Sequence, residues 1–460
     1  MHKLHIYHTN DIHSHFDRFS SLCSYLKQVR GENDLVFDAG DFNDFRSVMI
    51  SGTMGRAGKV LLKEAGYDAL CIGNNEGFSG IECLEEMAAD DLPLLSMNLT
   101  KLDGSPIRNV KKSIILERGG IRFLVIGVSP YFGIEGEGKY NVFFNMDGLH
   151  SHNPIPLIRD ELERNSGLYD FSILLSHQGI STDERCAREI ERLDIIIGGH
   201  SHTLLDEALV VNQTIIHHAG EYGKVIGKLS LEIDDGKIVG FNGEVIENTF
   251  EEDAGINKLI DEQTRIAHDK LNETLVEIEK LDFHISEEND LINFICDALM
   301  KEVKCDFSFI NHGIVNHGLA GKISRRTLLE VSPSPLNPTL IKITGRQFID
   351  AIRLSFDGNH VLKNGRGPGF RGTHIGGLGV SANVRITKEP FGIWIDEKRI
   401  APECVYTVMS DDYLQRGSGY PMLMCPDNES RFFPGFIRDL LQRNLLDESL
   451  RNGAKTRRIK

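Results

Sequence analysis

Five short apolar runs in the first half of the chain each stop at polar residues of kinds that bind metal ions. The runs span residues 4–7, 35–37, 69–72, 173–175 and 195–197. Their length and their polar or glycine boundaries are typical of buried strands. Apolar residues at helical spacing precede two of them, at 58–65 and at 183–192. This alternation of strand and helix predicts an α/β domain with parallel strands.

The apolar pattern also indicates where the first domain ends. An alternating run at 228–233 is followed by Asp-Asp-Gly at 234–236, typical of a tight hairpin turn, and by a second strand near 238–245. Residues 251–279 are charged, lack proline and carry a partial apolar stripe, which predicts a connecting helix. We therefore expect a first domain over residues 1–248.

A second domain is expected after this connecting segment, which we assign to residues 249–279. Apolar residues recur at helical spacing between 291 and 300 and predict a buried helix near the start of that domain. Residues 358–379 are rich in glycine and interrupted by Pro368, which indicates a long loop at a working surface. The second domain is assigned to residues 280–460.

Composition narrows the class of protein. The chain has 460 residues, too many for one ordinary core, with 40% hydrophobic and 26% charged residues, as in soluble globular proteins. Its formal net charge of -16 argues against a nucleic-acid-binding surface, because phosphate backbones are bound mainly by lysine and arginine. The sequence contains no stretch of about 20 apolar residues to span a bilayer. We expect neither nucleic acid nor a membrane as a partner.

The cysteines and the start of the chain indicate the compartment. Eight cysteines are spread along the chain without a Cys-x-x-Cys pair, which is typical of reduced thiols. The first three residues lead directly into the first apolar run, with no hydrophobic leader before it. Both features predict a cytoplasmic protein. The basic segment 455–460 is expected to be a solvated, frayed end.

The polar residues that follow the apolar runs combine carboxylate, amide and imidazole groups. They are Asp11, His13, Asp41, Asn74, His177, His200 and His202. Because the carboxyl ends of parallel strands meet at one edge of a sheet, these side chains can converge. His200 and His202 can both face one site only if the backbone bends, which we expect Gly198 and Gly199 to allow. Oxygen ligands mixed with imidazole favour Mn, Zn, Fe or Co.

The order of these motifs resembles the calcineurin-like metallophosphoesterases, and within them the 5'-nucleotidase family. The likeness runs from Asp11 to about residue 220 and continues more loosely from about residue 287. It implies a four-layer α-β-β-α catalytic domain of the α/β class, followed by an α+β C-terminal domain that binds the substrate. By matching motif, it implies one metal ion held by Asp11, His13 and His202, a second held by Asn74, His177 and His200, and Asp41 as the bridge between them.

A site of this kind implies hydrolysis of phosphate esters. Two divalent ions close together can share a hydroxide, lower its pKa toward neutrality and neutralise the phosphoryl oxygens during attack. The resemblance implies a small phosphorylated metabolite as substrate, with a nucleotide as the leading candidate and nucleotide catabolism as the process. It predicts a dinuclear metal-dependent phosphohydrolase of nucleotides or related small phosphate esters and anhydrides, working by metal-activated hydroxide.

The third run departs from the family pattern. The family has Gly-Asn-His followed by Glu or Asp, with an aspartate three residues after the histidine, whereas residues 73–76 read Gly-Asn-Asn-Glu and Phe78 replaces the aspartate. Asn75, in the place of the histidine, cannot deliver a proton to a leaving group. General acid catalysis is worth roughly 10²–10⁴ in rate, so we expect slow turnover of ordinary monoesters and a preference for good leaving groups. His15 and His218 are candidate replacements, with a supporting or surface role as the alternative for each.

The second domain departs from the family as well. The Asn-Gly-Gly-x-x-Arg motif is represented by Asn311 and Gly313, but Asn316 replaces its arginine and removes a bidentate phosphate ligand. Tyr413 and Tyr420 resemble the aromatics that sandwich a nucleobase in the family, with packing at a domain surface as the alternative for Tyr420. The predicted substrate-binding residues are Asn311, Gly313, Tyr413 and Tyr420.

The sequence leaves two functions open. The first is the phosphohydrolase described above. The second is a catalytically weakened, metal-containing protein that binds a ligand or has a regulatory role. All seven metal-binding candidates are retained, which favours the enzyme.

Overall fold

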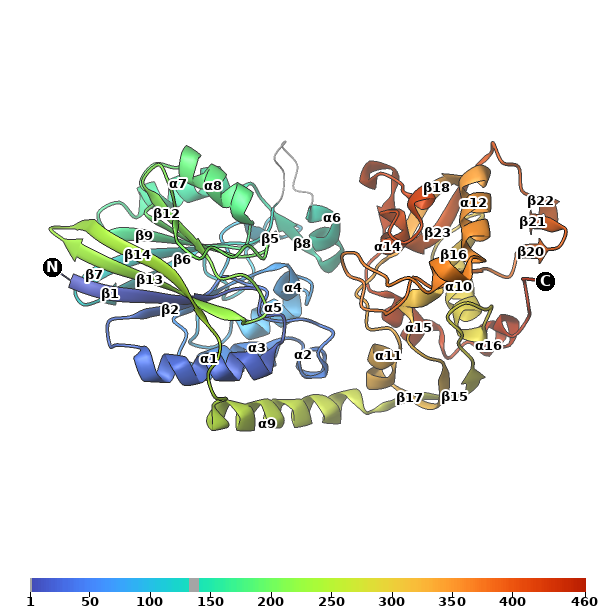
Figure 1. Ribbon diagram of the computed structural model, residues 1–460, viewed down its shortest axis with the longest axis horizontal. Helices are drawn as coiled ribbons and strands as arrows, with labels where there is room; N and C mark the ends of the chain where they lie inside the picture. The colour runs from blue at the N-terminus through green and yellow to red at the C-terminus, as the bar shows by residue number, and fades with distance from the viewer. Residues whose placement is uncertain (1, 132–139) are drawn as a thin grey trace. The chain divides into compact units, whose positions relative to one another are not determined.

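The structure, a computed structural model, describes residues 2–131 and 140–460 and divides into two compact units, Met1–Ala267 and His268–Lys460 (Figure 1). The division falls within helix α9 (Ala254–Leu271). Helix α9 lies within the segment 249–279 predicted as a connecting helix, and strand β15 (Thr274–Leu281) occupies the end of that segment. Among the described residues, no helix combines the length and the apolar character needed to cross a membrane.

The first unit contains two six-stranded sheets. The strand order is β14-β13-β1-β2-β3-β4 in one sheet and β11-β12-β10-β9-β7-β6 in the other. The strands of the first sheet are β1 (His2–Thr9), β2 (Leu35–Asp38), β3 (Ala69–Cys71), β4 (Leu94–Leu95), β13 (Val225–Asp234) and β14 (Lys237–Glu247). Those of the second are β6 (Ser113–Arg118), β7 (Ile121–Val128), β9 (Phe171–Ser176), β10 (Ile195–Gly198), β11 (Leu209–Val211) and β12 (Thr214–His218), and a separate ribbon pairs β5 (Leu99–Lys101) with β8 (Leu149–Ser151).

Parallel pairing aligns the five predicted strand ends, three in one sheet and two in the other. Strands β1, β2, β3 and β4 are parallel neighbours, and so are β7, β9, β10 and β12. The predicted hairpin is present between β13 and β14, where Asp235 and Gly236 both have positive φ, 47° and 70°. Two successive left-handed residues suit the right-handed twist of the paired strands.

Alternation along the strands builds four layers. In β7, Phe123 and Val125 pack into a core between the two sheets, whereas Leu124 and Ile126 face the helices on the outer side. Successive strand residues point to opposite faces, so both faces of each sheet are covered. Figure 1 shows α1 and α3 on one side of the unit and α7 and α8 on the other. The predicted four-layer α-β-β-α architecture is confirmed.

Two helices of the first unit, α2 and α7, begin at residues whose side chains cap them. In one example, the Asn153 side chain accepts a hydrogen bond from Ile155 N at 3.2 Å, and Pro154 occupies the first helical turn. The helices are α1 (Phe16–Val29), α2 (Val48–Thr53), α3 (Arg56–Glu64), α4 (Asn74–Gly77), α5 (Ile81–Met87), α6 (Asn141–Phe144), η1 (Asn145–Asp147), α7 (Pro154–Arg164) and α8 (Ile180–Glu189).

The second unit is α+β, as predicted. Its main sheet has the order β19-β16-β23-β18-β24, beside a two-stranded and a three-stranded sheet. The remaining strands are β16 (Phe307–Asn311), β17 (Leu319–Ser324), β18 (Pro338–Thr344), β19 (Leu378–Val380), β20 (Val384–Lys388), β21 (Phe391–Ile395), β22 (Lys398–Arg399), β23 (Val405–Asp411) and β24 (Arg431–Phe432). The helices are α10 (Asp290–Glu302), η2 (His312–Ile314), α11 (Arg325–Val331), α12 (Gly345–Ser355), α13 (Gly358–Val361), α14 (Asp412–Gln415), η3 (Pro421–Leu423), η4 (Asp427–Glu429), α15 (Ile437–Asn444) and α16 (Glu448–Ala454).

Arg458 and Ile459 of the C-terminal segment are built into this unit, so the prediction of a frayed end is wrong, although residues 455–457 and 460 are exposed. Arg458 is 3% exposed, and its guanidinium lies 2.5 Å from Asp297 Oδ2. The backbone N–H of Arg458 donates to Glu288 Oε1 at 2.6 Å, and Ile459 pairs with Ile386. A buried guanidinium needs a carboxylate partner, which Asp297 supplies.

Candidate metal centre

The first unit brings six of the seven predicted metal ligands into two groups. One group is Asp11, His13 and His202, and the other is Asp41, His177 and His200. Within each group the ligand atoms lie within 4.8 Å of one another. The loops after β1, β2, β9 and β10 contribute these side chains, as expected for a site at the carboxyl ends of parallel strands.

Asp41, a member of the second group, also approaches the first. One of its carboxylate oxygens is 3.7 Å from His13 Nε2 and the other is 3.5 Å from His177 Nε2. Asp11 also approaches both groups, with Oδ1 3.3 Å from His202 Nε2 and 3.8 Å from His177 Nε2. The two groups therefore form one continuous centre, and a carboxylate in the position of Asp41 can bridge two cations.

The donor atoms of the centre fit a bound cation. Asp11 Oδ1, Asn74 Oδ1 and His177 Nε2 are buried, and none of them has a hydrogen-bond partner among residues 2–131 and 140–460. Asp11 Oδ1 and His177 Nε2 lie 3.8 Å apart within the centre. Buried polar atoms are almost always paired, and both of these can donate a lone pair to a metal ion, so they fit a bound cation. Coordination by Asn74 stays a prediction.

The backbone at these residues is strained. Five of the proposed ligands have positive φ, namely Asp11 (51°), His13 (46°), Asp41 (55°), His200 (74°) and His202 (53°). A left-handed conformation costs a residue with a side chain on the order of 1–3 kcal/mol, and such residues cluster at functional sites. These five residues lie in the loops after β1, β2 and β10, where such clustering is a feature typical of functional loops.

The bend before His200 and His202 has a different origin from the one predicted. Gly198 and Gly199 do not have positive φ, and the histidines themselves take the left-handed turns. Gly198 is required for space, because a Cβ there would lie 2.0 Å from His218 Nε2. The glycines thus admit neighbouring groups rather than bend the chain.

Two histidines of the centre are oriented by contacts of their Nδ1 atoms. His202 Nδ1 lies 2.6 Å from Glu221 Oε2, and Lys224 holds the other oxygen of Glu221 at 2.7 Å. His177 Nδ1 lies 2.7 Å from the backbone oxygen of Ala39. Both contacts leave Nε2 as the nitrogen that faces the centre, as is usual for histidines that bind metals.

Asn75 holds Asp41. Its backbone N–H donates to Asp41 Oδ1 at 2.8 Å, and its side-chain amide donates to Oδ2 at 2.7 Å. Its neighbour Glu76 is buried and accepts hydrogen bonds from the backbone N–H groups of Asp41 and Gly73, both at 2.9 Å, and of Asn43 at 3.0 Å. The start of α4 therefore fixes both the carboxylate and the backbone of Asp41.

The electrostatics of the centre favour cations. Burial opposes ionisation of Asp41, but the charge and the hydrogen bond of His177, together with the charge of His13, outweigh it and lower the pKa of Asp41 to about 2. Burial also opposes a charged His177, yet Asp41 and Asp11 raise its pKa to about 10. Burial and the charge of His177 lower the pKa of His200 to about 4. Without metal, a proton on His177 balances part of the carboxylate charge, so metal binding releases protons.

The structure gives different surroundings to His218 and His15, the two candidate replacements for the missing acid. His218 is fully buried, and its Nε2 lies 2.8 Å from Asp183 Oδ2, which gives it a supporting role beneath Gly198. His15 lies at the start of α1, where its ring packs 4.4 Å from that of Tyr222 and its Nδ1 contacts Ile12 O. Neither contact marks His15 as a proton donor.

The predicted substrate-binding residues of the second unit lie together but are covered. Tyr413 and Tyr420 are 0% exposed. The Asn311 side chain donates to Ile375 O at 2.7 Å, and Gly313 N donates to the same oxygen at 3.2 Å. For Tyr420, packing within the unit is what the structure shows. A role in binding a substrate stays a prediction for all four residues.

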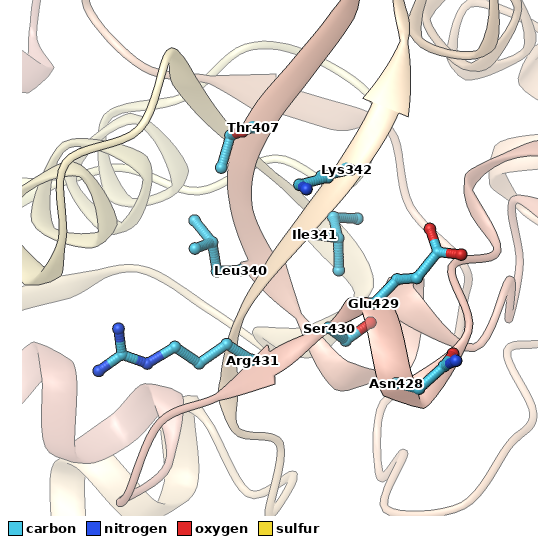
Figure 2. Close-up of a pocket in the computed structure, with 8 residues that line it drawn as sticks. All are labelled: Leu340, Ile341, Lys342, Thr407, Asn428, Glu429, Ser430 and Arg431. Carbon is cyan, nitrogen blue, oxygen red and sulfur yellow. The ribbon is translucent and has the colours of Figure 1, made fainter.

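A surface hollow of about 350 Å³ lies elsewhere on the second unit. Figure 2 shows it beside β18, where Arg431 and Glu429 extend in opposite directions. None of the predicted site residues lines it. Because its charged groups diverge, it offers no converging set of ligands.

The α-β-β-α sandwich and its paired carboxylate and histidine groups define a metallophosphoesterase. Residues 4–204 match the family of calcineurin-like phosphoesterases, and residues 273–424 match the 5'-nucleotidase C-terminal domain. The chain belongs to the calcineurin-like metallophosphoesterases that carry a 5'-nucleotidase C-terminal domain, a family of hydrolases. The family resemblance seen in the sequence is confirmed.

Relatives in sequence agree with this assignment, and solved structures share the fold. The chain is 29% identical to the uncharacterized metallophosphoesterase YunD of Bacillus subtilis, over 95% of this chain and 98% of the relative. It is 24% identical to a 5'-nucleotidase of Diplobatis ommata, over 92% and 83% of the two chains. Its fold is similar to that of the NAD nucleotidase of Haemophilus influenzae, with a TM-score of 0.65, 16% identity and 96% coverage of both chains. A 5'-nucleotidase precursor from Thermus thermophilus has a TM-score of 0.58 at 18% identity, over 100% of this chain and 97% of that one.

Proposed function

We propose that the chain is a dinuclear metal-dependent phosphohydrolase of nucleotides or related small phosphate esters and anhydrides. The observation that carries the proposal is the position of Asp41, within 3.7 Å of His13 Nε2 and 3.5 Å of His177 Nε2. The 5'-nucleotidase C-terminal domain supports a small phosphorylated metabolite as the substrate. Relatives named 5'-nucleotidase support a nucleotide among the substrates.

Each residue of the centre has a role in this proposal. Asp11, His13 and His202 would hold one ion, Asn74, His177 and His200 would hold the other, and Asp41 would bridge them. Two bound divalent ions would supply positive charge for the phosphoryl oxygens and lower the pKa of a water toward neutrality. The mixture of imidazole, carboxylate and amide ligands suits Mn, Zn, Fe or Co.

Asn75 sets the substrate preference because it cannot supply a proton to the leaving group. Both of its N–H contacts go to Asp41, so it positions that carboxylate, and an amide has no proton to give a leaving group. The ester oxygen must then leave without help from residue 75. We expect faster hydrolysis of aryl phosphates and anhydrides than of alkyl monoesters.

We also propose a cytoplasmic location. All eight cysteines are free, and Cys404 among them is exposed. Free thiols are typical of a reducing compartment. Localisation of a tagged chain by fractionation of cells tests this proposal, and recovery outside the cytoplasm would contradict it.

The test of the activity compares wild type with Asp41→Asn after removal of metal and reloading with Mn, Zn, Co or Mg separately. Wild type should hydrolyse p-nitrophenyl phosphate, and Asp41→Asn should lose roughly 10²-fold or more in rate, because a neutral amide is a poor bridge between cations. The matched control is Asp235→Asn in the β13–β14 turn, which should leave the rate unchanged. Thermal unfolding checks that each variant is folded.

One outcome would favour a different function. Wild type that binds metal in stoichiometric amounts, but hydrolyses no ester or anhydride in a broad panel, would be a metal-containing binding or regulatory protein. The panel therefore includes AMP, NAD, glycerol 3-phosphate and pyrophosphate beside the aryl ester.

A further inference from the structure

Each of the two metal-binding groups is bordered by a tyrosine that is not one of the proposed ligands. Tyr222, in the loop between β12 and β13, lies against the first group, and Tyr140, at the start of α6, lies against the second. Both tyrosines are partly buried. The first group is Asp11, His13 and His202, and the second is Asp41, His177 and His200.

Tyr222 contacts all three residues of the first group. Its ring centroid lies 5.7 Å from that of His13 and 5.9 Å from that of His202, with the planes at 67° in both pairs. Nearly perpendicular rings at this separation have the edge-to-face arrangement that aromatic pairs prefer. The backbone N–H of Tyr222 donates to Asp11 O at 2.7 Å. One residue therefore borders every proposed ligand that belongs to this group alone.

Tyr222 is itself fixed by its surroundings. Its ring centroid lies 4.4 Å from that of His15 and 5.2 Å from Lys224 Nζ. Its backbone oxygen accepts a hydrogen bond from Arg18 Nη1 at 3.3 Å. Its φ is 61°, a left-handed conformation that persists in a residue with a side chain only where the neighbouring structure holds it. The ring of Tyr222 is thus a fixed surface against which two imidazoles pack.

Tyr140 makes the corresponding contact with the second group. Its ring centroid lies 5.5 Å from that of His200, with the planes at 82°. Phe78 and Phe144 pack against Tyr140, with centroid separations of 6.4 and 5.7 Å. Phe78 stands where the family pattern has an aspartate. This departure from the pattern therefore gives Tyr140 an apolar neighbour in place of a charged one.

The orientation of an imidazole decides how well it binds a metal ion, because its nitrogen must point at the ion. Contacts of Nδ1 with Glu221 and with Ala39 O orient His202 and His177. A fixed ring packed against an imidazole restricts the rotation of that imidazole as well. The contacts of Tyr222 and Tyr140 with the histidines are made by their rings, so phenylalanine can replace either tyrosine in this role.

We infer that Tyr222 and Tyr140 are positioning residues, Tyr222 for the ion of the first group and Tyr140 for the ion of the second. The inference rests on the two ions of the proposed function but not on hydrolysis. The affinity for each ion then depends on its own tyrosine, so the two ions can be weakened one at a time.

The test titrates the metal-stripped full chain with Mn by calorimetry and follows the bound ions by electron paramagnetic resonance. Two bridged Mn ions are spin-coupled, whereas a single bound Mn gives the spectrum of an isolated ion. Wild type should bind two ions. Tyr222→Ala and Tyr140→Ala should each weaken one binding step about tenfold or more, as found for groups that orient metal ligands, and give the isolated-ion spectrum at intermediate Mn. Tyr222→Phe and Tyr140→Phe should keep wild-type affinities.

The variant His202→Ala assigns each tyrosine to its ion, because it should retain only the ion of the second group. In this variant, Tyr140→Ala should weaken the remaining ion about tenfold or more, and Tyr222→Ala should leave it unchanged. The matched control is Tyr25→Ala on α1, whose ring stacks on Phe250 with centroids 4.5 Å apart. It also loses an aromatic contact, but it should change neither affinity.

Three results would overturn the inference. They are unchanged Mn affinities in a folded Tyr222→Ala or Tyr140→Ala, equal weakening of the remaining ion by both in the His202→Ala chain, and phenylalanine variants as weak as the alanine variants. If an alanine variant does not fold, leucine at the same position, which fills part of the space without a flat ring, takes its place. Wild type that binds two ions but hydrolyses no ester would refute the proposed function and leave this test intact. Wild type that binds fewer than two ions would refute both.

Discussion

Replacing Asn75 distinguishes two roles that a residue in this position could have, an anchor for Asp41 or a partner of the leaving group. Its backbone N–H and its side-chain amide each donate to one oxygen of Asp41, at 2.8 and 2.7 Å. Asn75→Ala keeps the backbone contact and removes the amide. We expect this loss to weaken metal binding and to leave the chemistry of the leaving group unchanged.

The structure sets the size of the effect. A hydrogen bond to a charged group contributes about 1.5–3 kcal/mol. Loss of this hydrogen bond removes part of the free energy that holds Asp41 in its bridging orientation. The apparent affinity for the ions should then fall roughly 10- to 100-fold, the range found for groups that orient metal ligands. The remaining bond from the backbone of residue 75 keeps the loss toward the lower end.

The assay has two parts. Metal affinity is measured by titrating the stripped chain with Mn, and kcat/KM is measured at saturating metal for aryl phosphates with leaving groups of graded pKa. Asn75→Ala should recover near wild-type rates at saturating metal, with an unchanged dependence on leaving-group pKa. Asn75→His can donate a proton, so that dependence should flatten, with a gain of up to roughly 10²–10⁴ on poor leaving groups.

A steeper dependence on the leaving group in Asn75→Ala at saturating metal would refute this reasoning, because Asn75 would then act on the ester oxygen. The control is Asn165→Ala. The Asn165 amide also donates to a carboxylate, Glu161 Oε1, at 3.2 Å, but on α7. That variant should alter neither metal affinity nor the leaving-group dependence.

Three further predictions concern the surroundings of the centre and the second unit. Glu221→Gln should lower Mn affinity roughly 10-fold or more, measured by titration and reversed by excess metal, because the carboxylate that orients His202 is lost. Gly198→Ala should lower the free energy of unfolding by about 1–3 kcal/mol in urea denaturation, since its methyl group would overlap His218. Burial raises the pKa of Asp411 from 3.8 to about 7. Between these two pH values the folded chain keeps a proton that the unfolded chain has lost, so the stability of the folded chain falls as pH rises through this range. Asp411→Asn should therefore become more stable than wild type by roughly 3 kcal/mol between pH 5 and 8, and an unchanged difference across that range would contradict the assignment.

The strands of the first unit could be predicted because their signals are local, whereas its four layers were expected from the family resemblance. A polar residue directly after an apolar run marks a strand end, and parallel pairing aligns such ends within each sheet. Asp11 and Asp41 follow strands of one sheet and His177 follows a strand of the other, so their meeting at one site also depends on the packing of the two sheets. Their role as metal ligands stays a prediction.

The supporting residues could not be predicted in the same way, because each acts across a long stretch of chain. Glu221 contacts His202 directly, but no residue near Glu221 in the sequence indicates that contact. Phe370 lies far along the chain from Tyr413, which it contacts, in a segment whose glycines predicted only a long loop at a working surface. Glu76 was visible as a carboxylate after Asn75, but its three backbone partners belong to loops that only the fold brings together.

The buried C-terminal segment has a consequence for biosynthesis. The second unit cannot complete its core until Arg458 has left the ribosome and reached Asp297. The first unit ends at Ala267, so its strands and metal ligands are all available much earlier in translation. At about 5–20 residues per second, the interval is roughly 10–40 s. Nascent chains stalled before residue 458 should therefore already protect the first unit from protease while the second remains open to cleavage.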